Sequence, residues 1–290
     1  RVNLLKADRE SVLETLHADG VEAYPTPYSP DGIRLPTKPG LTRWPVYKDG
    51  LVDVQDEGSQ LIARLLGARR REMVCDFCAG AGGKTLAVGA LMRSTGSLYA
   101  FDVNEKRLAG MAPRMRRAGL TNVHPAAIRS EQDPRVKRLR GKFDRVLVDA
   151  PCTGTGTLRR NPDLKWRLSP EELERINAIQ KSVLENAAKL VKAGGRLVYA
   201  TCSLLKRENQ DVVEAFLAAH PDWQLVPAKD VFAEQRIVFP ESQWERFGAY
   251  MQLLPHVNNT DGFFAAVLER TGKAERAKPV KRAVAEESAE

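Results

Sequence analysis

Two cysteines stand at the ends of two apolar segments that have the composition of buried strands. Cys152 follows a proline in the segment DAPCTGTGTLRRNPD, and Cys202 ends the segment GRLVYATCS. An ionised thiol is a strong, soft nucleophile, and Asp149 places a carboxylate just before Cys152. A lone strand cysteine is usually a small buried filler, but a pair at adjacent strand ends beside an acid indicates covalent chemistry.

These groups suit a reaction on an electron-poor ring. A thiolate can add to a carbon of a pyrimidine, which makes the neighbouring carbon nucleophilic and able to attack a methyl sulfonium. Asp149, held in a pocket that excludes water, would protonate or hydrogen-bond the ring nitrogen on which charge develops. Cys152 would then act as the base that removes a proton, so that the first thiol can leave.

The elements that must position these groups are predicted to form a mainly parallel sheet. From Glu72 onward, short apolar runs alternate with amphipathic helical stretches, which is typical of βαβ units with helices on both faces of the sheet. Ligands of such sheets bind beyond the carboxyl ends of the strands, so Cys152 and Cys202 are predicted to face one another across one crevice. The runs are MVCDFCAG, SLYAFDV, NVHPAAI, FDRVLVDAP and GRLVYATCS, with GFFAAVLER as a last strand.

A glycine-rich loop follows the first run, in VCDFCAGAGGKT. Gly80, Gly82 and Gly83 let the backbone approach a ligand, and the amides at the start of the next helix favour polar or anionic groups. The spacing does not fit the phosphate-binding loop of nucleotide kinases. Asp102 ends the second run, where a carboxylate can hold ribose hydroxyls, and both NAD and S-adenosylmethionine enzymes use this combination.

Composition divides the chain into three regions. Residues 1–50 contain a helical DRESVLETLHADG and a stretch rich in Pro and Gly, which predicts a small N-terminal α/β subdomain. Residues 51–270 carry the alternating strands and helices of the main domain. Ser169 and Glu172 there begin a long helix with a capping box, and the helix is predicted to end at KAGG. Residues 271–290 are charged and lack aromatics, which predicts a disordered tail.

The 290 residues include 45 Lys and Arg against 37 Asp and Glu, and the net charge of +8 favours a polyanionic partner. No apolar run approaches the ~18 residues of a membrane span and no export signal opens the sequence, so we expect a cytoplasmic protein with reduced cysteines. Cys75 and Cys78 invite a zinc or redox interpretation, but no second pair or spaced histidines accompany them. Strand packing is the favoured role of Cys75, and no metal site is predicted.

Together these motifs resemble the RNA cytosine-5 methyltransferases of the NOL1/NOP2/Sun group, most closely the bacterial enzymes that act on 16S ribosomal RNA. The resemblance extends from about Val54 to Glu269, and its most specific segments are DAPCTGTGTLRRNPD and YATCSLLKRENQDVV. It implies a Rossmann-like S-adenosylmethionine-dependent methyltransferase fold with a mainly parallel, seven-stranded sheet. It also implies S-adenosylmethionine as cofactor, ribosomal RNA as partner, no membrane and a monomer.

The resemblance further implies a role for each site residue. Cys202, in the Thr-Cys-Ser motif, is the nucleophile that bonds to cytosine, Cys152 helps to release the product, and Asp149 stands at the junction of cofactor and target base. The residues implied to bind the cofactor are Cys78, Ala79, Gly80, Ala81, Gly82, Gly83, Lys84, Asp102 and Asp149. The first fifty residues resemble part of the small RNA-binding domain that precedes the catalytic domain in this group.

Two positions depart from the family pattern. Gly80 and Ala81 stand where the family commonly has Ala-Pro, which predicts a more flexible cofactor loop. At the end of the third strand, where the family often has an acid that binds the adenine amino group, this chain has Ala127. We expect Glu131, Asp133 or a backbone carbonyl to take that role.

Basic residues gather on both sides of the predicted fourth strand. The first cluster is Arg129, Arg135, Lys137, Arg138, Arg140 and Lys142, and the second is Arg159, Arg160, Lys165 and Arg167. Solvated surface explains each cluster as well as phosphate contact does. Trp166 and Phe264 are candidates for stacking on bases, with burial as the alternative for both. A cytosine inside a stem would have to be extruded, which favours unpaired RNA.

Three other functions stay open. A DNA cytosine methyltransferase shares the Pro-Cys turn but uses that cysteine as nucleophile with a Glu-Asn-Val motif, whereas RENQDVV here follows Cys202. A non-catalytic RNA-binding or ribosome-assembly factor that keeps the fold would explain the altered glycine loop and the missing third-strand acid. An NAD-dependent oxidoreductase would leave both strand-end cysteines unexplained.

Overall fold

Strands and helices alternate along most of the chain, which a computed structural model describes over residues 1–37 and 40–272. The strands are β1 (Tyr24–Pro25), β2 (Ile33–Arg34), β3 (Met73–Asp76), β4 (Ser97–Asp102), β5 (Val123–Ala127), β6 (Phe143–Asp149), β7 (Val191–Thr201), β8 (Trp223–Val226), β9 (Met251–Leu253) and β10 (Phe263–Arg270). The α-helices are α1 (Arg9–Ala18), α2 (Pro45–Lys48), α3 (Glu57–Leu66), α4 (Gly83–Leu91), α5 (Glu105–Ala109), α6 (Met111–Ala118), α7 (Pro134–Lys137), α8 (Leu164–Arg167), α9 (Pro170–Ala188), α10 (Gln210–Ala219), α11 (Ala228–Ala233), α12 (Glu241–Phe247) and α13 (Pro255–Asn258). Short 3-10 helices are η1 (Leu41–Arg43), η2 (Thr155–Thr157) and η3 (Lys206–Glu208).

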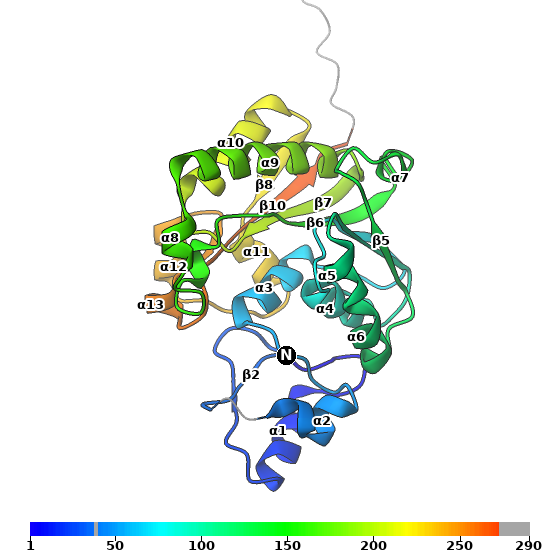
Figure 1. Cartoon of the computed structure of the whole chain (residues 1–290), viewed down its shortest axis with the longest axis vertical. Helices are drawn as coiled ribbons and strands as arrows, with labels where there is room; N and C mark the ends of the chain where they lie inside the picture. Colours follow the sequence, from blue (N-terminus) through cyan, green and yellow to red (C-terminus); the bar gives the residue numbers. More distant parts are fainter. Residues whose placement is uncertain (38–39, 273–290) are drawn as a thin grey trace, which may run out of the picture.

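One large sheet forms the centre of the molecule (Figure 1). Its strand order is β5-β4-β3-β6-β7-β10-β8, and the short β9 pairs with β10 beside this path. The first five strands of the order pair in parallel, and β10 runs antiparallel to β7, β8 and β9. The predicted mainly parallel sheet is therefore confirmed, with β9 as an eighth strand beyond the predicted seven.

Each face of the sheet has a hydrophobic core of its own, because successive strand residues point to opposite sides. Leu147 and Val198 belong to the core that α3, α4 and α11 cover. Val148 and Tyr199, the next residues on the same two strands, belong to the core that α9 and α10 cover. Figure 1 shows these two groups of helices on opposite sides of the strands, as the alternating sequence pattern predicts.

The long helix α9 begins as predicted and ends earlier than predicted. The hydroxyl of Ser169 caps it by accepting a hydrogen bond from the backbone N–H of Glu172 at 3.2 Å. The expectation that KAGG ends the helix is wrong, since α9 stops at Ala188 and residues 192–195 lie within β7. A shift in register between β6 and β7 makes room for these residues, and Gly194 takes a left-handed φ of +74° there.

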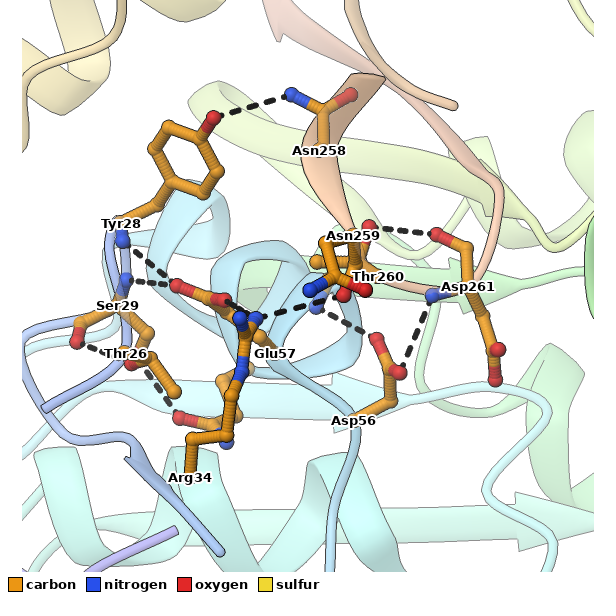
Figure 2. A network of polar contacts seen from close by, with 12 residues as sticks. Thr26, Tyr28, Ser29, Arg34, Asp56, Glu57, Asn258, Asn259, Thr260 and Asp261 are labelled. Atoms are coloured by element: carbon orange, nitrogen blue, oxygen red, sulfur yellow. Dashed lines mark hydrogen bonds and ion pairs between the residues drawn. The ribbon is translucent and has the colours of Figure 1, made fainter. Parts of the chain in front are cut away.

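The N-terminal unit packs against the large domain through polar groups. It has a separate small core that includes Val2 and Val52, just beyond the predicted boundary at residue 50. The backbone N–H groups of Tyr28 and Ser29 donate to a carboxylate oxygen of Glu57, at the start of α3, over 2.6 and 2.8 Å (Figure 2). Most of the predicted tail, from residue 273, lies outside the described residues. Within those residues, no helix is both long enough and apolar enough to cross a bilayer.

Candidate active site

The two predicted cysteines meet at the carboxyl edge of the sheet. Cys152 follows the end of β6 and Cys202 follows the end of β7, and their Sγ atoms lie 3.2 Å apart. Both line one cavity of about 520 Å³, together with Asp149, the last residue of β6. β6 and β7 are parallel neighbours, which is why their two carboxyl ends bring the sulfurs to the same point.

The backbone around Cys202 is held by a close approach of three loops. The N–H of Gly156, in η2, donates to the carbonyl oxygen of Cys202 at 2.8 Å. The N–H of Gly262, just before β10, donates to the carbonyl oxygen of Gly156 at 2.8 Å. A Cβ atom on Gly156 would lie 2.8 Å from the Cys202 carbonyl oxygen and closer still to that of Gly262. Only glycine fits there, which explains Gly156, the second glycine of CTGTGT.

The two thiols differ in how readily they ionise. The hydrogen bond from Cys152 lowers the pKa of Cys202 below its ordinary value, and the positive charge of Lys84 adds to this effect against burial and Asp149. The same hydrogen bond, followed by burial, raises the pKa of Cys152 well above its ordinary value. Within the pair, ionisation is therefore favoured at Cys202 and disfavoured at Cys152.

Lys84, at the start of α4, contacts the carboxylate of the site. Its Nζ atom lies 2.8 Å from Oδ2 of Asp149. Burial has the largest effect and opposes the charge of Lys84, but Asp149, together with Asp76 and Cys202, raises the pKa of the lysine. The structure thus pairs Lys84, which sequence reasoning assigned to the cofactor loop, with Asp149, and its charge also lowers the pKa of Cys202.

The glycine loop and the second-strand acid are joined directly. Asp102, at the end of β4, accepts a hydrogen bond from the N–H of Gly80 at 2.7 Å and lines the cavity, as do Cys78 and Asp149. Gly80 and Gly82 take left-handed φ values of +54° and +85°, a conformation that favours glycine. Cofactor binding by this loop stays a prediction, and the departure at Gly80 is compatible with the turn.

One of the two candidate carboxylates for the missing third-strand acid lines the cavity. Glu131 lies after β5, lines the cavity, and accepts a hydrogen bond from Ser182 of α9 at 2.6 Å. Asp133, the other candidate, instead caps α7 by accepting a bond from the N–H of Arg135. Contact of Glu131 with adenine stays a prediction.

Asp76 is a buried acid outside the cavity lining that sequence reasoning missed. It ends β3 and is fully buried, and its Oδ2 accepts a hydrogen bond from Thr85 at 2.6 Å. Its other oxygen has no hydrogen-bond partner within the described part of the chain. Burial raises the pKa of Asp76 to about 7. The only signal in the sequence is its place at a strand end, next to the glycine loop.

The residues predicted to contact RNA separate into exposed and buried groups. Trp166 is 80% exposed, and the Nζ atom of Lys165 lies 4.9 Å from its ring centre. Phe264 is fully buried on β10, so of the two roles that the sequence left open for it, burial is the one that the structure supports. Arg159 and Arg160 both form ion pairs with Asp261, which partly neutralises their charge. Phe264 shares one face of β10 with Ala266 and Leu268, and this face packs into the core.

Cys75 of the CDFC segment packs in the core beneath α9, where it is fully buried. Across residues 1–37 and 40–272, no group of three or more His, Cys, Asp or Glu side chains is arranged to hold a metal ion. The cysteines of this chain that lie in one cavity are Cys78, Cys152 and Cys202. The cavity therefore presents thiols together with the carboxylates of Asp102, Glu131 and Asp149.

A family comparison matches the part of the chain that carries this site. The family described as 16S rRNA methyltransferase RsmB/F matches residues 63–269, and a ferredoxin-like domain of RsmF/B-like methyltransferases matches residues 1–41. The chain belongs to the RsmB/F family. This confirms the resemblance that the Pro-Cys and Thr-Cys-Ser motifs indicate, and RsmB/F membership also accounts for a small N-terminal unit ahead of the sheet.

Curated RsmB/F relatives are similar over nearly the whole chain. The probable ribosomal RNA small subunit methyltransferase B of Bacillus subtilis (strain 168) is 36% identical over 272 residues, which are 94% of this chain and 59% of that protein. The protein of the same description from Synechocystis sp. (strain ATCC 27184 / PCC 6803 / Kazusa) is 37% identical and is likewise covered over 59% of its length. The chain thus spans about 59% of the length of these relatives.

A solved structure confirms the methyltransferase fold. The methyltransferase homolog protein from Pyrococcus horikoshii has a TM-score of 0.78 at 31% identity, over 93% of this chain and 85% of that one. This RsmB/F chain therefore has the Rossmann-like fold of methyltransferases. The cysteine pair lies at the carboxyl edge of its strands.

Proposed function

We propose that this chain is the catalytic part of an S-adenosylmethionine-dependent methyltransferase that modifies carbon 5 of a cytosine in ribosomal RNA. The observation that carries the proposal is the 3.2 Å separation of the Cys152 and Cys202 sulfurs beside Asp149 in one cavity. Family membership and the names of the relatives support RNA as the substrate. A monomer acting in the cytoplasm is part of the same proposal.

The cavity fits a nucleoside cofactor. Its volume of about 520 Å³ lies within the usual range for ligand sites, roughly 300–1,000 Å³. Asp102 offers a carboxylate for ribose hydroxyls, Glu131 offers one for the adenine amino group, and Phe77 and Ile128 supply apolar wall. S-adenosylmethionine bound there would supply an electrophilic methyl group close to the sulfur pair.

The proposed reaction begins at Cys202. Its thiolate adds to carbon 6 of the cytosine, and the electron pair of the 5,6 double bond moves to carbon 5, which takes the methyl group. Cys152 gives its own proton to solvent and, as a thiolate, takes the proton from carbon 5, so that the double bond reforms and the sulfur of Cys202 leaves as a thiolate. When Cys202 is bonded to carbon its charge is lost, and with it a main reason for the raised pKa of Cys152.

Asp149 would hold the base while the charge moves. As sulfur adds to carbon 6, the ring nitrogen becomes electron-rich and takes a proton from solvent, and the carboxylate of Asp149 at the edge of the cavity accepts a hydrogen bond from the resulting N–H. Lys84 pairs with that carboxylate and lowers the pKa of Cys202, so it supports both the carboxylate and the anionic thiol. One cation thus serves the two acidic groups of the site as charge passes through the ring.

The thiol asymmetry favours this assignment over that of a DNA cytosine methyltransferase. In the DNA enzymes the Pro-Cys cysteine is the nucleophile, which would be Cys152 here. The pKa of Cys152 is raised while that of Cys202 is lowered, so the thiolate forms on the second motif. The third alternative, an oxidoreductase, gives neither sulfur a role.

Trapping the covalent intermediate tests the proposal. Cys152→Ala should accumulate a protein–RNA adduct that survives denaturing electrophoresis, because Cys202 can attack but nothing removes the proton. Cys202→Ala should give no adduct, and Cys75→Ala, which replaces a buried cysteine outside the cavity, should turn over normally. Adduct lost with Cys152→Ala and kept with Cys202→Ala would favour the DNA-type assignment.

A separate measurement addresses the non-catalytic alternative. Calorimetric titration of the chain with S-adenosylmethionine should give saturable binding that Asp102→Ala weakens. An absence of binding at millimolar cofactor would support an RNA-binding factor that only keeps the fold.

A further inference from the structure

Glu208 is a buried carboxylate for which the proposed reaction has no direct use. It ends η3, shortly after Cys202 in the chain, and its side chain is shut off from solvent. No ion pair within residues 1–37 and 40–272 involves it, although burying a carboxylate without a cation is costly. Hydrogen bonds to the charged group must therefore offset that cost.

Those hydrogen bonds come from the residues that directly follow the two cysteines. Thr153, next to Cys152, donates its backbone N–H to Oε1 at 2.8 Å and its hydroxyl to Oε2 at 2.6 Å. Ser203, next to Cys202, donates its hydroxyl to Oε2. One carboxylate thus joins the loop after β6 to the loop after β7, at the positions adjoining the sulfurs.

Further contacts fix this carboxylate to the body of the protein. Gln180 of α9 donates its amide to Oε1 of Glu208 at 2.9 Å and also reaches the carbonyl oxygen of Pro151 at 2.9 Å. The hydroxyl of Tyr199, on β7, donates to the backbone carbonyl oxygen of Glu208 at 2.7 Å. Because α9 and β7 belong to the rigid sheet and its cover, the junction between the two loops has little freedom to move.

We propose that Glu208 is a positioning residue, which holds the loops of Cys152 and Cys202 at the separation that lets one sulfur act on a base bonded to the other. This inference rests on the proposed function and deepens it. The bonds from Gly156 and Gly262 fix the backbone of Cys202 from one side, and Glu208 ties both cysteine loops from the other.

The charge of Glu208 has a second consequence for the pair. Cys152 is faced by Cys202 and by Glu208, both of which disfavour its ionisation, whereas Cys202 is faced by Asp149 and the cation Lys84. The hydrogen bond with Cys202 and burial raise the pKa of Cys152 most, and the charge of Glu208 adds to them. The same carboxylate that ties the two loops thus also disfavours ionisation of Cys152.

The first test needs no RNA and reports how often the two sulfurs meet. Diamide takes two hydrogen atoms from neighbouring thiols and leaves a disulfide, and peptide mass spectrometry follows the Cys152–Cys202 crosslink. We expect Glu208→Ala to slow crosslinking about tenfold or more, because untethered loops sample many separations. Glu208→Gln keeps an acceptor for the bonds to Oε1 and should crosslink at least as fast as the unaltered chain.

Glu214→Ala is the matched control, since Glu214 is an exposed glutamate on the neighbouring helix α10. Equal crosslinking rates in Glu208→Ala and Glu214→Ala would overturn the proposal. If Glu208→Ala does not fold, Thr153→Val takes its place, because it removes one hydroxyl bond and keeps the side-chain shape. We then expect crosslinking to slow about threefold, and an unchanged rate would overturn the proposal equally.

The second test uses RNA and separates positioning from mere loss of stability. With Cys152 intact, Glu208→Ala should accumulate the covalent RNA adduct, since attack by Cys202 comes before the step that needs Cys152 close by. Glu208→Gln should restore product release, whereas a purely structural role would lower adduct and product together and so overturn the proposal. If Cys152→Ala itself traps no adduct, the proposed function fails, and the diamide rates still decide for or against Glu208.

Discussion

The Nζ atom of Lys84 lies 2.8 Å from Oδ2 of Asp149, and this ion pair links the helix after the glycine loop to the strand that leads to Cys152. The lysine side chain is 10% exposed and the aspartate side chain 32%. One cation thus serves the carboxylate and, through space, the thiol of Cys202. Removing Lys84 should therefore affect both Asp149 and Cys202.

Lys84→Met should make Cys202 harder to ionise. Loss of the cation leaves the negative charge of Asp149 unopposed, so the pKa of Cys202 should rise and its alkylation by iodoacetamide at pH 7 should slow. We expect kcat/KM to fall by about a hundredfold, the usual scale for losing one charge-stabilising group. Lys192→Met, which removes a lysine paired with Asp144 far from the thiols, is the control. An unchanged alkylation rate in Lys84→Met would contradict this role.

Asp76→Asn should stabilise the fold in a manner that depends on pH. Burial raises the pKa of Asp76 in the folded chain to about 7, above the 3.8 of the ordinary group. A raised pKa means that the stability it contributes is present below about pH 4 and is lost as the pH rises through 7. Asparagine does not ionise, so its advantage over aspartate should grow by about 3 kcal/mol between pH 5 and pH 8. Urea unfolding of both proteins at the two pH values measures the difference, and an equal difference at both would refute the prediction.

Glu131→Ala should weaken the binding of S-adenosylmethionine. Glu131 lines the cavity at the place where the third strand offers no acid, and its carboxylate is held by Ser182. Loss of a hydrogen bond from a charged group should raise the Kd about tenfold, measured by calorimetric titration. Asp133→Asn is the matched control, because that carboxylate caps α7 and should leave the Kd unchanged. Equal values for the two variants would point to a backbone carbonyl as the adenine contact.

Trp166→Ala should weaken RNA binding and leave cofactor binding intact. The ring is 80% exposed on α8 and carries Lys165 over it, so it can stack on a base without any rearrangement of the core. Stacking of a base on an aromatic ring is worth about 1–3 kcal/mol, so the Kd for a single-stranded RNA should rise about tenfold at fixed salt. Val238→Ala, at another exposed apolar residue, is the control. Fluorescence anisotropy with labelled RNA would show no change if Trp166 does not contact the RNA.

Local pattern was sufficient for the sheet and for the general position of the site. Apolar runs separated by helical stretches predict parallel strands, and parallel strands place Cys152, Cys202 and Asp102 at one edge whatever the details of packing. The N-cap at Ser169 was equally local, since it involves neighbours along the chain, whereas Glu172 pairs with Arg175 instead of completing the predicted capping box. KAGG was misjudged because glycine permits both a helix end and a strand irregularity, and the pairing with β6 decides between them.

Contacts between segments that are distant in the sequence could not be predicted from local pattern. Phe264 and Trp166 are both aromatic residues near the predicted site, and only the packing of β10 between other strands buries one of them and leaves the other in solvent. Asp133 and Glu131 are two residues apart, yet one caps a helix and the other reaches the cavity. Which carboxylate meets which group depends on how whole elements dock.

The residue types and their order along the chain by themselves determined that two thiols and a carboxylate lie at the ends of neighbouring strands, because strand periodicity is a local property. Only the tertiary structure decided that hydrogen bonding favours ionisation of Cys202 over Cys152 and that Glu208 contacts the residues after both cysteines. Charge and hydrogen bonding act across space between segments far apart in sequence, and their strength depends on distances and burial that exist only in the folded chain.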